Sequence, residues 1–81
     1  MITLLYFGPL KDITSKKNEQ ITYQPGLTVG VIRKLLVDSY GTGIGPLLDA
    51  SGVAVNQEYV EENRVLEEGD EIVFIPPVSS G

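Results

Sequence analysis

The chain has 81 residues, the length of one domain, and 42% of them are hydrophobic, which is enough for a single compact core. It has no cysteine and no histidine, so disulfides, thiolate metal sites and the usual neutral-pH general base are excluded. The net charge of −5, from 11 acidic and 6 basic side chains, disfavours nucleic acid as a partner. We therefore expect neither a self-sufficient hydrolase nor a zinc enzyme.

The N-terminal segment is predicted to be a buried strand over residues 2–7, closed by Gly8 and Pro9. No charged region precedes this strand, no cleavage site of small residues follows it, and no apolar stretch approaches the roughly 18 residues that span a bilayer. We expect a soluble cytoplasmic protein that does not bind membranes and whose partner is a basic or apolar protein.

Two further elements are predicted before the main helix. Residues 10–14 can form one helical turn, and residues 19–23 alternate polar and apolar side chains, as a half-buried strand does. A turn signal beside this second strand suggests that it forms a hairpin with the first.

The main helix is predicted to begin after Thr28, a good N-cap residue, and to stop at Gly41. Its apolar residues follow helical spacing and define one face: Val29, Ile32, Leu35, Leu36 and Tyr40. Residues 41–52 carry four glycines and one proline. We expect a loop there, with a short turn at Leu47 and Leu48.

The second half of the chain is predicted as short strands and turns. In chain order these are a strand at 53–55, a turn at 56–57, an extended pair at 59–60, a strand or turn at 65–66 and a tight turn at 67–70. The last strand, 71–75, ends at Pro76 and Pro77, because proline has no N–H group to continue a ladder.

The first and last strands are apolar at nearly every position, which is typical of central strands. Placed side by side and parallel, they need a long crossover, and the helical segment supplies it. The prediction is an α+β fold, a ubiquitin-like β-grasp with a mixed sheet and one main helix packed across one face. We expect the domain to comprise residues 1–76, with residues 77–81 as an extended flexible C-terminal tail.

The tail has an unusual composition. Its two prolines stiffen the exit from the sheet, and its last residue, Gly81, places no side chain beside the terminal carboxylate. Such an end can thread a narrow channel and offer its carboxylate to another enzyme. A frayed terminus is the alternative, and the residues alone leave both readings open.

Three stretches, 4–8, 55–60 and 68–78, carry a resemblance to a known family. With them the chain resembles, over essentially its whole length, the small sulfur-carrier subunit of molybdopterin synthase, the MoaD family. The specific signal is the combination of a Gly-Asp turn, an apolar strand, a double proline and a terminal glycine. Ser80 departs from the family pattern, which has a glycine before the last residue.

The resemblance implies a sulfur carrier in molybdenum cofactor biosynthesis. An E1-like enzyme would adenylate the Gly81 carboxylate with ATP, and a sulfur donor, either a sulfurtransferase or a cysteine desulfurase, would convert it to a thiocarboxylate. The tail would then enter the large subunit of a heterotetrameric synthase and give its sulfur to cyclic pyranopterin monophosphate. The inserted residues would be Pro76, Pro77, Val78, Ser79 and Ser80. The chain itself would bind no cofactor and contribute no catalytic side chain.

Strand alternation predicts the partner surface. Phe7, Tyr59 and Ile75 would form an exposed apolar patch beside the root of the tail, although ordinary core packing is the alternative. The acidic pairs at 61–62, 67–68 and 70–71 are expected to form solvated faces, or to attract basic partner surfaces. No metal site is expected, because their spacing matches no calcium loop.

Other functions stay open at this point. The thiamine sulfur carrier and the modifier that serves tRNA thiolation share the fold and the chemistry, but the double proline favours the molybdopterin protein. A non-covalent β-grasp interaction module with an inactive tail is a further alternative.

Overall fold

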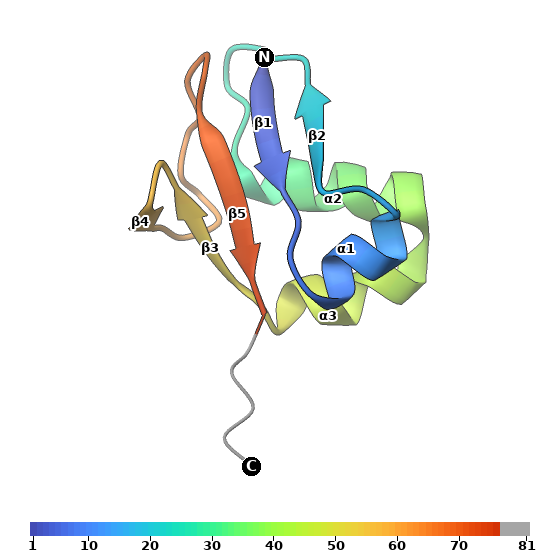
Figure 1. The fold of residues 1–81 in the computed structure, drawn as a ribbon. Helices are drawn as coiled ribbons and strands as arrows, with labels where there is room; N and C mark the ends of the chain where they lie inside the picture. Colours follow the sequence, from blue (N-terminus) through green and yellow to red (C-terminus); the bar gives the residue numbers. More distant parts are fainter. Residues whose placement is uncertain (77–81) are drawn as a thin grey trace.

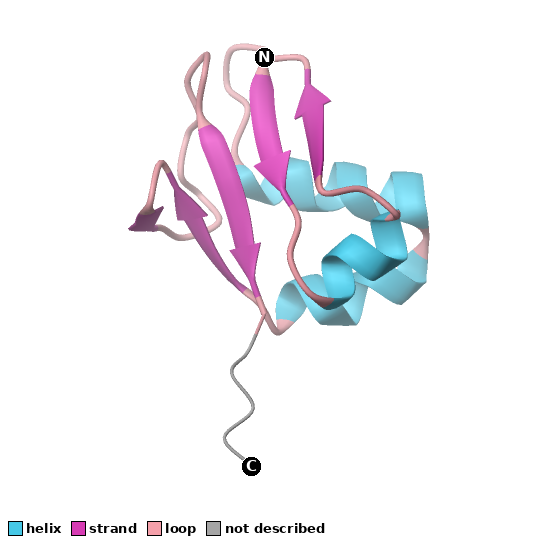
Figure 2. Ribbon diagram, in the orientation of Figure 1, coloured by secondary structure: helices cyan, strands magenta, loops and turns pink. Residues whose placement is uncertain are grey.

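The computed structural model describes residues 1–76 as one five-stranded mixed sheet with helices packed against it (Figures 1 and 2). The strands are β1 (Ile2–Leu5), β2 (Asn18–Ile21), β3 (Gly52–Val55), β4 (Glu58–Tyr59) and β5 (Glu71–Ile75). The helices are α1 (Pro9–Thr14), α2 (Val29–Tyr40), the 3₁₀ turn η1 (Thr42–Ile44) and α3 (Gly45–Asp49). In Figure 1, α2 lies behind the sheet, and α1 and α3 lie at the end where β1 and β5 finish.

The sheet has the strand order β2-β1-β5-β3-β4. The central strands β1 and β5 run parallel, with Thr3 opposite Glu71 and Leu5 opposite Val73. The remaining pairs, β1 with β2, β3 with β5 and β3 with β4, are antiparallel. The predicted β-grasp arrangement is therefore confirmed, including the parallel central pair and the helical crossover that joins its two halves.

Helix α2 begins and ends where the sequence predicts. The Thr28 hydroxyl accepts a hydrogen bond from the Val31 N–H at 3.3 Å, so it satisfies one of the free donors of the first turn. At the other end Gly41 has φ +86°, a conformation that favours glycine, and its N–H donates to the Val37 carbonyl at 2.8 Å.

The predicted buried face of α2 is correct except at one residue. Val29, Ile32 and Leu36 are buried, and Tyr40 packs partly against the core. Leu35 is 39% exposed, because it lies off the stripe that the other apolar residues form around the helix.

The expectation of a loop over 41–52 is wrong. This segment forms η1 and α3, because Ile44 and Leu48 are fully buried and anchor it to the core. Its glycines do not prevent short helices when buried apolar residues hold them, and Pro46 lies in the first turn of α3, where proline is tolerated. The first strand is also shorter than predicted, since it ends at Leu5.

Alternation along the central strands separates two faces of the sheet, as predicted. Ile2, Leu4 and Tyr6 point inward, as do Ile72 and Phe74, and each is at most 1% exposed. Burial of each such side chain contributes about 1.5–3 kcal/mol, so the central pair supplies a substantial part of the stability of the fold. Within residues 1–76, no helix combines the length and apolar character that crossing a bilayer requires.

Candidate functional site

An apolar row crosses the outer face of the sheet, which the helices do not cover. The strand register pairs Leu5 with Val73, Val73 with Ala54, and Ala54 with Tyr59. Residues opposite one another in a sheet point to the same face, so these four side chains lie side by side. Tyr59 ends the row and is 77% exposed. The row therefore offers an apolar strip to a partner molecule.

The structure brings Tyr59 and Ile75 together through a glycine. Gly52 lies opposite Ile75 in the register, and a Cβ atom on Gly52 would lie 3.7 Å from Cε1 of the Tyr59 ring. The tyrosine ring thus lies over the bare backbone of Gly52, next to the half-buried Ile75. Two of the three predicted patch residues are neighbours for this reason.

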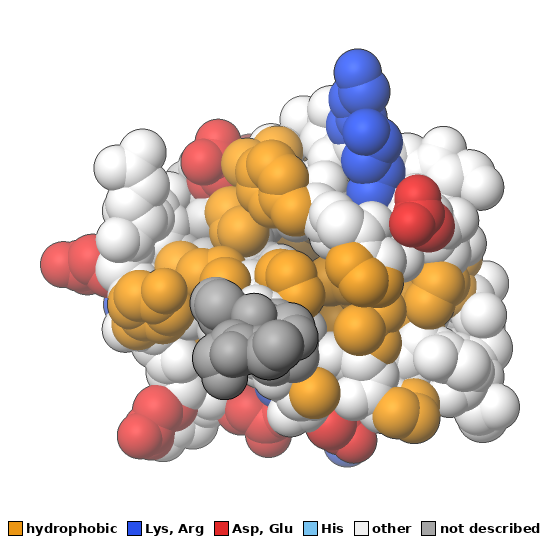
Figure 3. Space-filling view, turned by 60° about the horizontal axis from the view of Figure 1, so that its bottom comes forward, with side chains coloured by type: hydrophobic (Ala, Val, Ile, Leu, Met, Phe, Trp, Pro, Cys, Tyr) orange, Lys and Arg blue, Asp and Glu red, His pale blue; other side chains and the backbone are white. Residues whose placement is uncertain are grey.

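Phe7, the third patch residue, is followed by Gly8, which lies near Pro76, the last residue that the structure describes. Phe7 is 53% exposed, and the adjoining Gly8 packs near Pro76, whose Cγ would lie 3.9 Å from a Cβ at Gly8. Gly8 has φ +55°, so it turns the chain from β1 into α1 in a conformation that other residues rarely adopt. Figure 3 shows hydrophobic side chains gathered on this end of the molecule.

Of the three predicted residues, Ile75 directly precedes Pro76, and Phe7 directly precedes Gly8, which packs near that proline. We call Phe7, Tyr59 and Ile75 the outer patch. The remaining tail residues predicted to insert into a partner lie outside the described residues, as does the terminal carboxylate: Pro77, Val78, Ser79, Ser80 and Gly81. Among residues 1–76, no group of three or more Asp or Glu side chains is placed to hold a metal ion.

A buried aspartate fixes the start of β5, which leads to the tail. Asp70 is 6% exposed, so the expectation that it belongs to a solvated acidic face is wrong. One of its carboxylate oxygens accepts from the Asn56 amide and the other from the Glu67 N–H, both at 2.8 Å. Asn56 in turn accepts from the Glu71 N–H at 3.0 Å. Asp70 thus joins the β3–β4 turn to the strand that carries the tail.

Glu19 collects three hydrogen bonds that sequence reasoning missed. The hydroxyls of Tyr6 and Tyr40 donate to its Oε1 atom at 2.8 and 2.7 Å, and the Lys16 ammonium donates to Oε2 at 3.3 Å. These residues come from the segment after β1 (Tyr6), from β2 (Glu19), from α2 (Tyr40) and from the loop before β2 (Lys16). No local motif marks such a cluster, because only the fold brings its members together.

The Glu19 cluster shifts the pKa values of its members. Partial burial opposes the charge on Glu19, but the hydrogen bonds from Tyr40, Tyr6 and Lys16 outweigh it and lower the pKa of the carboxyl. Burial, together with the carboxylate beside it, raises the pKa of Tyr6. The same causes raise the pKa of Tyr40. Both hydroxyls therefore stay protonated and act as donors.

Comparison with known proteins places the chain among small carrier proteins. The model of the ThiS family matches residues 4–81. The molybdopterin synthase sulfur carrier subunit of Phaeosphaeria nodorum is 33% identical over 87 residues, covering 98% of this chain and 88% of its own length. These matches confirm the resemblance found in the sequence.

Solved structures agree with the fold. The putative molybdopterin converting factor subunit 1 of Pyrococcus furiosus superposes with a TM-score of 0.83 at 21% identity, covering 95% of this chain and 97% of its own. A complex of subunits 1 and 2 of the molybdopterin-converting factor of Helicobacter pylori contains a chain that is 26% identical. That chain superposes with a TM-score of 0.71 and covers 99% of this chain and 97% of its own.

Proposed function

The chain belongs to the ThiS family, and we propose that it is the sulfur carrier subunit of a molybdopterin synthase. The observation that carries this proposal is a family match that runs from residue 4 to the terminal Gly81. The relative from Phaeosphaeria nodorum, a molybdopterin synthase sulfur carrier subunit that matches nearly the whole chain, supports the choice of pathway.

The working group is the carboxylate of Gly81. Attack of this carboxylate on the α-phosphorus of ATP, in the site of an E1-like enzyme, forms an acyl-adenylate and releases pyrophosphate. The persulfide sulfur of a sulfurtransferase or a cysteine desulfurase then attacks the acyl carbon and expels AMP, and a second thiol cleaves the resulting acyl disulfide, which leaves a thiocarboxylate on Gly81 and a disulfide on the donor side. In the large synthase subunit this sulfur replaces an oxygen substituent on a side-chain carbon of cyclic pyranopterin monophosphate. Water then cleaves the resulting thioester, so that the sulfur stays on the pterin and the Gly81 carboxylate is restored. We place the cycle in the cytoplasm, where ATP is available.

The outer patch is suited to guide this transfer. Ile75 passes directly into Pro76, and Phe7 lies beside that proline through Gly8. A partner that covers the outer patch therefore receives the tail at the same place. Apolar, partly exposed side chains of this kind are common at the centre of protein interfaces. We propose that the large synthase subunit docks here and that the assembly is a heterotetramer. The complex between subunits 1 and 2 of the molybdopterin-converting factor of Helicobacter pylori supports the pairing of a small with a large subunit.

Conversion of the Gly81 carboxylate to a thiocarboxylate in vitro tests the proposal. The chain is incubated with ATP, an activating enzyme and a sulfur donor, and its intact mass is measured. We expect a gain in mass equal to replacement of one oxygen by one sulfur, located on the C-terminal peptide.

A chain with one extra residue after Gly81 is the matched control. It should fold with the same melting temperature and accept no sulfur, since its glycine has no free carboxylate. An extended chain that still supports molybdopterin synthesis would refute the role of Gly81. If the thiocarboxylate form of the protein supplies sulfur to thiamine synthesis or tRNA thiolation, and not to cyclic pyranopterin monophosphate, the protein belongs to another pathway.

A further inference from the structure

Some of the few basic side chains of this acidic protein form ion pairs, and others do not. Arg33 pairs with Asp49 at 3.0 Å and Glu62 at 2.6 Å, and Lys16 pairs with Glu19 at 3.3 Å. Four basic side chains form no ion pair with any residue in the described range 1–76: Lys11, Lys17, Lys34 and Arg64. Only Lys11 and Lys17 among these four lie together.

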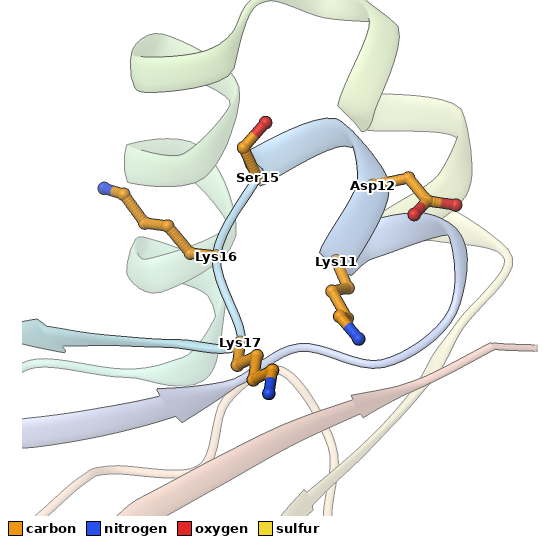
Figure 4. A pocket seen from close by; sticks show the side chains of 5 residues that line it. All are labelled: Lys11, Asp12, Ser15, Lys16 and Lys17. Carbon is orange, nitrogen blue, oxygen red and sulfur yellow. The ribbon is translucent and has the colours of Figure 1, made fainter.

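Lys11 and Lys17 line one shallow hollow of about 330 Å³, between α1 and the loop before β2. Figure 4 shows their amino groups on the same side of this loop, whereas Asp12 points away from both. Lys16, which also lines the hollow, points in another direction in Figure 4, toward α2. It is held there by Glu19, and its ammonium group lies 5.7 Å from the centre of the Tyr40 ring.

These two lysines adjoin the outer patch through the backbone. The N–H of Leu10, which precedes Lys11, donates to the Phe7 carbonyl at 3.2 Å. The carbonyl of Lys17 accepts from the N–H of Tyr6, the residue before Phe7, at 2.9 Å.

We propose that Lys11 and Lys17 form a basic arm of the docking surface, and that carboxylate side chains of the large synthase subunit bind it. This inference rests on the proposed function, because it names the chemistry of that partner beside the outer patch. A protein that covers the patch excludes water from the adjoining lysines, and this strengthens attraction to a carboxylate. The net charge of −5 opposes a polyphosphate or RNA on the same arm.

The arm has a clear physical task. Apolar contacts on the outer patch are non-directional, so they leave the partner free to slide across the sheet. Two charges at one end of the patch fix the orientation in which the partner approaches, and they accelerate the encounter. The neutralised Lys16 does not compete for the same acidic groups. The arm would thereby align the tail with the opening that receives it.

Charge reversal tests the arm with a control from the same chain. Affinity and association rate for the purified large subunit are measured at low and high salt for wild type, Lys11→Glu, Lys17→Glu and Lys34→Glu. Lys34 is exposed on α2, outside the arm, and its reversal changes the net charge by the same amount. We expect each arm variant to weaken binding about tenfold at low salt, mainly through slower association, and the effect to shrink at high salt.

The control separates the possible outcomes. Lys34→Glu should weaken binding much less than either arm variant, and all three should melt at the wild-type temperature. Equal losses at all three positions would show an effect of net charge alone and would overturn the arm, as would unchanged binding at Lys11 and Lys17. Wild-type protein that fails to bind the large subunit would refute the proposed function, and the arm with it.

Discussion

Removal of the Glu19 carboxylate provides a quantitative test of the packing between the sheet and helix α2. In Glu19→Ala the hydroxyls of Tyr6 and Tyr40 and the ammonium of Lys16 lose their shared acceptor. The three lost bonds differ in cost, because the three donors differ in exposure. The expected loss of stability can therefore be worked out donor by donor.

Tyr6 dominates the loss because it is 1% exposed, so its hydroxyl cannot turn to water. A buried donor left without an acceptor costs about 1–3 kcal/mol. Tyr40 is only partly buried, and its bond contributes about 0.5–1.5 kcal/mol. The pair with Lys16 adds little, because it is exposed and screened by water and salt. We expect Glu19→Ala to lose about 2–4 kcal/mol, which lowers the melting temperature of a domain of this size by about 10–25 °C.

Urea denaturation followed by circular dichroism measures this loss, with Glu19→Gln and Tyr6→Phe as companions. Glu19→Gln keeps an oxygen acceptor for the two hydroxyls, so it should lose less than half as much stability. Tyr6→Phe removes the hydroxyl that lacks an acceptor in Glu19→Ala. The double variant should therefore lose less stability than the sum of the losses in the two single variants. A stability of Glu19→Ala within about 0.5 kcal/mol of wild type would refute the reasoning.

Three further predictions concern pH, the outer patch and the turn before β5. The pKa of Glu19 is lowered in the folded state, so the carboxylate contributes fully to stability above its unfolded-state pKa, and this contribution is lost as the pH falls through its folded-state pKa. The difference in stability between wild type and Glu19→Gln should therefore shrink below about pH 4. A difference that is constant with pH would contradict this. Phe7→Asp should weaken binding to the large subunit about tenfold or more. The melting temperature should change by only a few degrees, because the ring is largely exposed. A collapse in stability would instead mean that Phe7 belongs to the hydrophobic core. Asp70→Ala should cost about 2–4 kcal/mol in chemical denaturation, because it strands the Glu67 N–H and the Asn56 amide, and a loss below about 1 kcal/mol would rule out this anchoring role.

Most of the fold follows from local sequence patterns. The apolar strands, the Thr28 cap and the Gly41 stop each depend on neighbouring residues, so periodicity and capping rules predict them. The segment over 41–52 could not be predicted in this way. Its helices depend on burial of Ile44 and Leu48 by distant parts of the chain, and this tertiary packing overrides the weak helix propensity of four glycines.

The candidate site was predicted in part. Strand alternation predicts the outward side chains of β1 and β5, and the turn at 56–57 predicts that Tyr59 returns beside them. The two buried or partly buried carboxylate clusters were not predictable. Glu19 and Asp70 each look like ordinary surface carboxylates in the sequence, and only the register of the sheet and the path of α2 bring their donors within hydrogen-bond distance.

The mass of the intact protein, isolated from cells that are making molybdenum cofactor, tests the central claim most directly. We expect a fraction of the molecules to carry one sulfur in place of one oxygen at the Gly81 carboxylate, and this fraction to vanish when the activating enzyme is absent. Protein that keeps only its unmodified carboxylate in such cells, while molybdopterin synthesis proceeds, would contradict the assignment of this chain as the sulfur carrier.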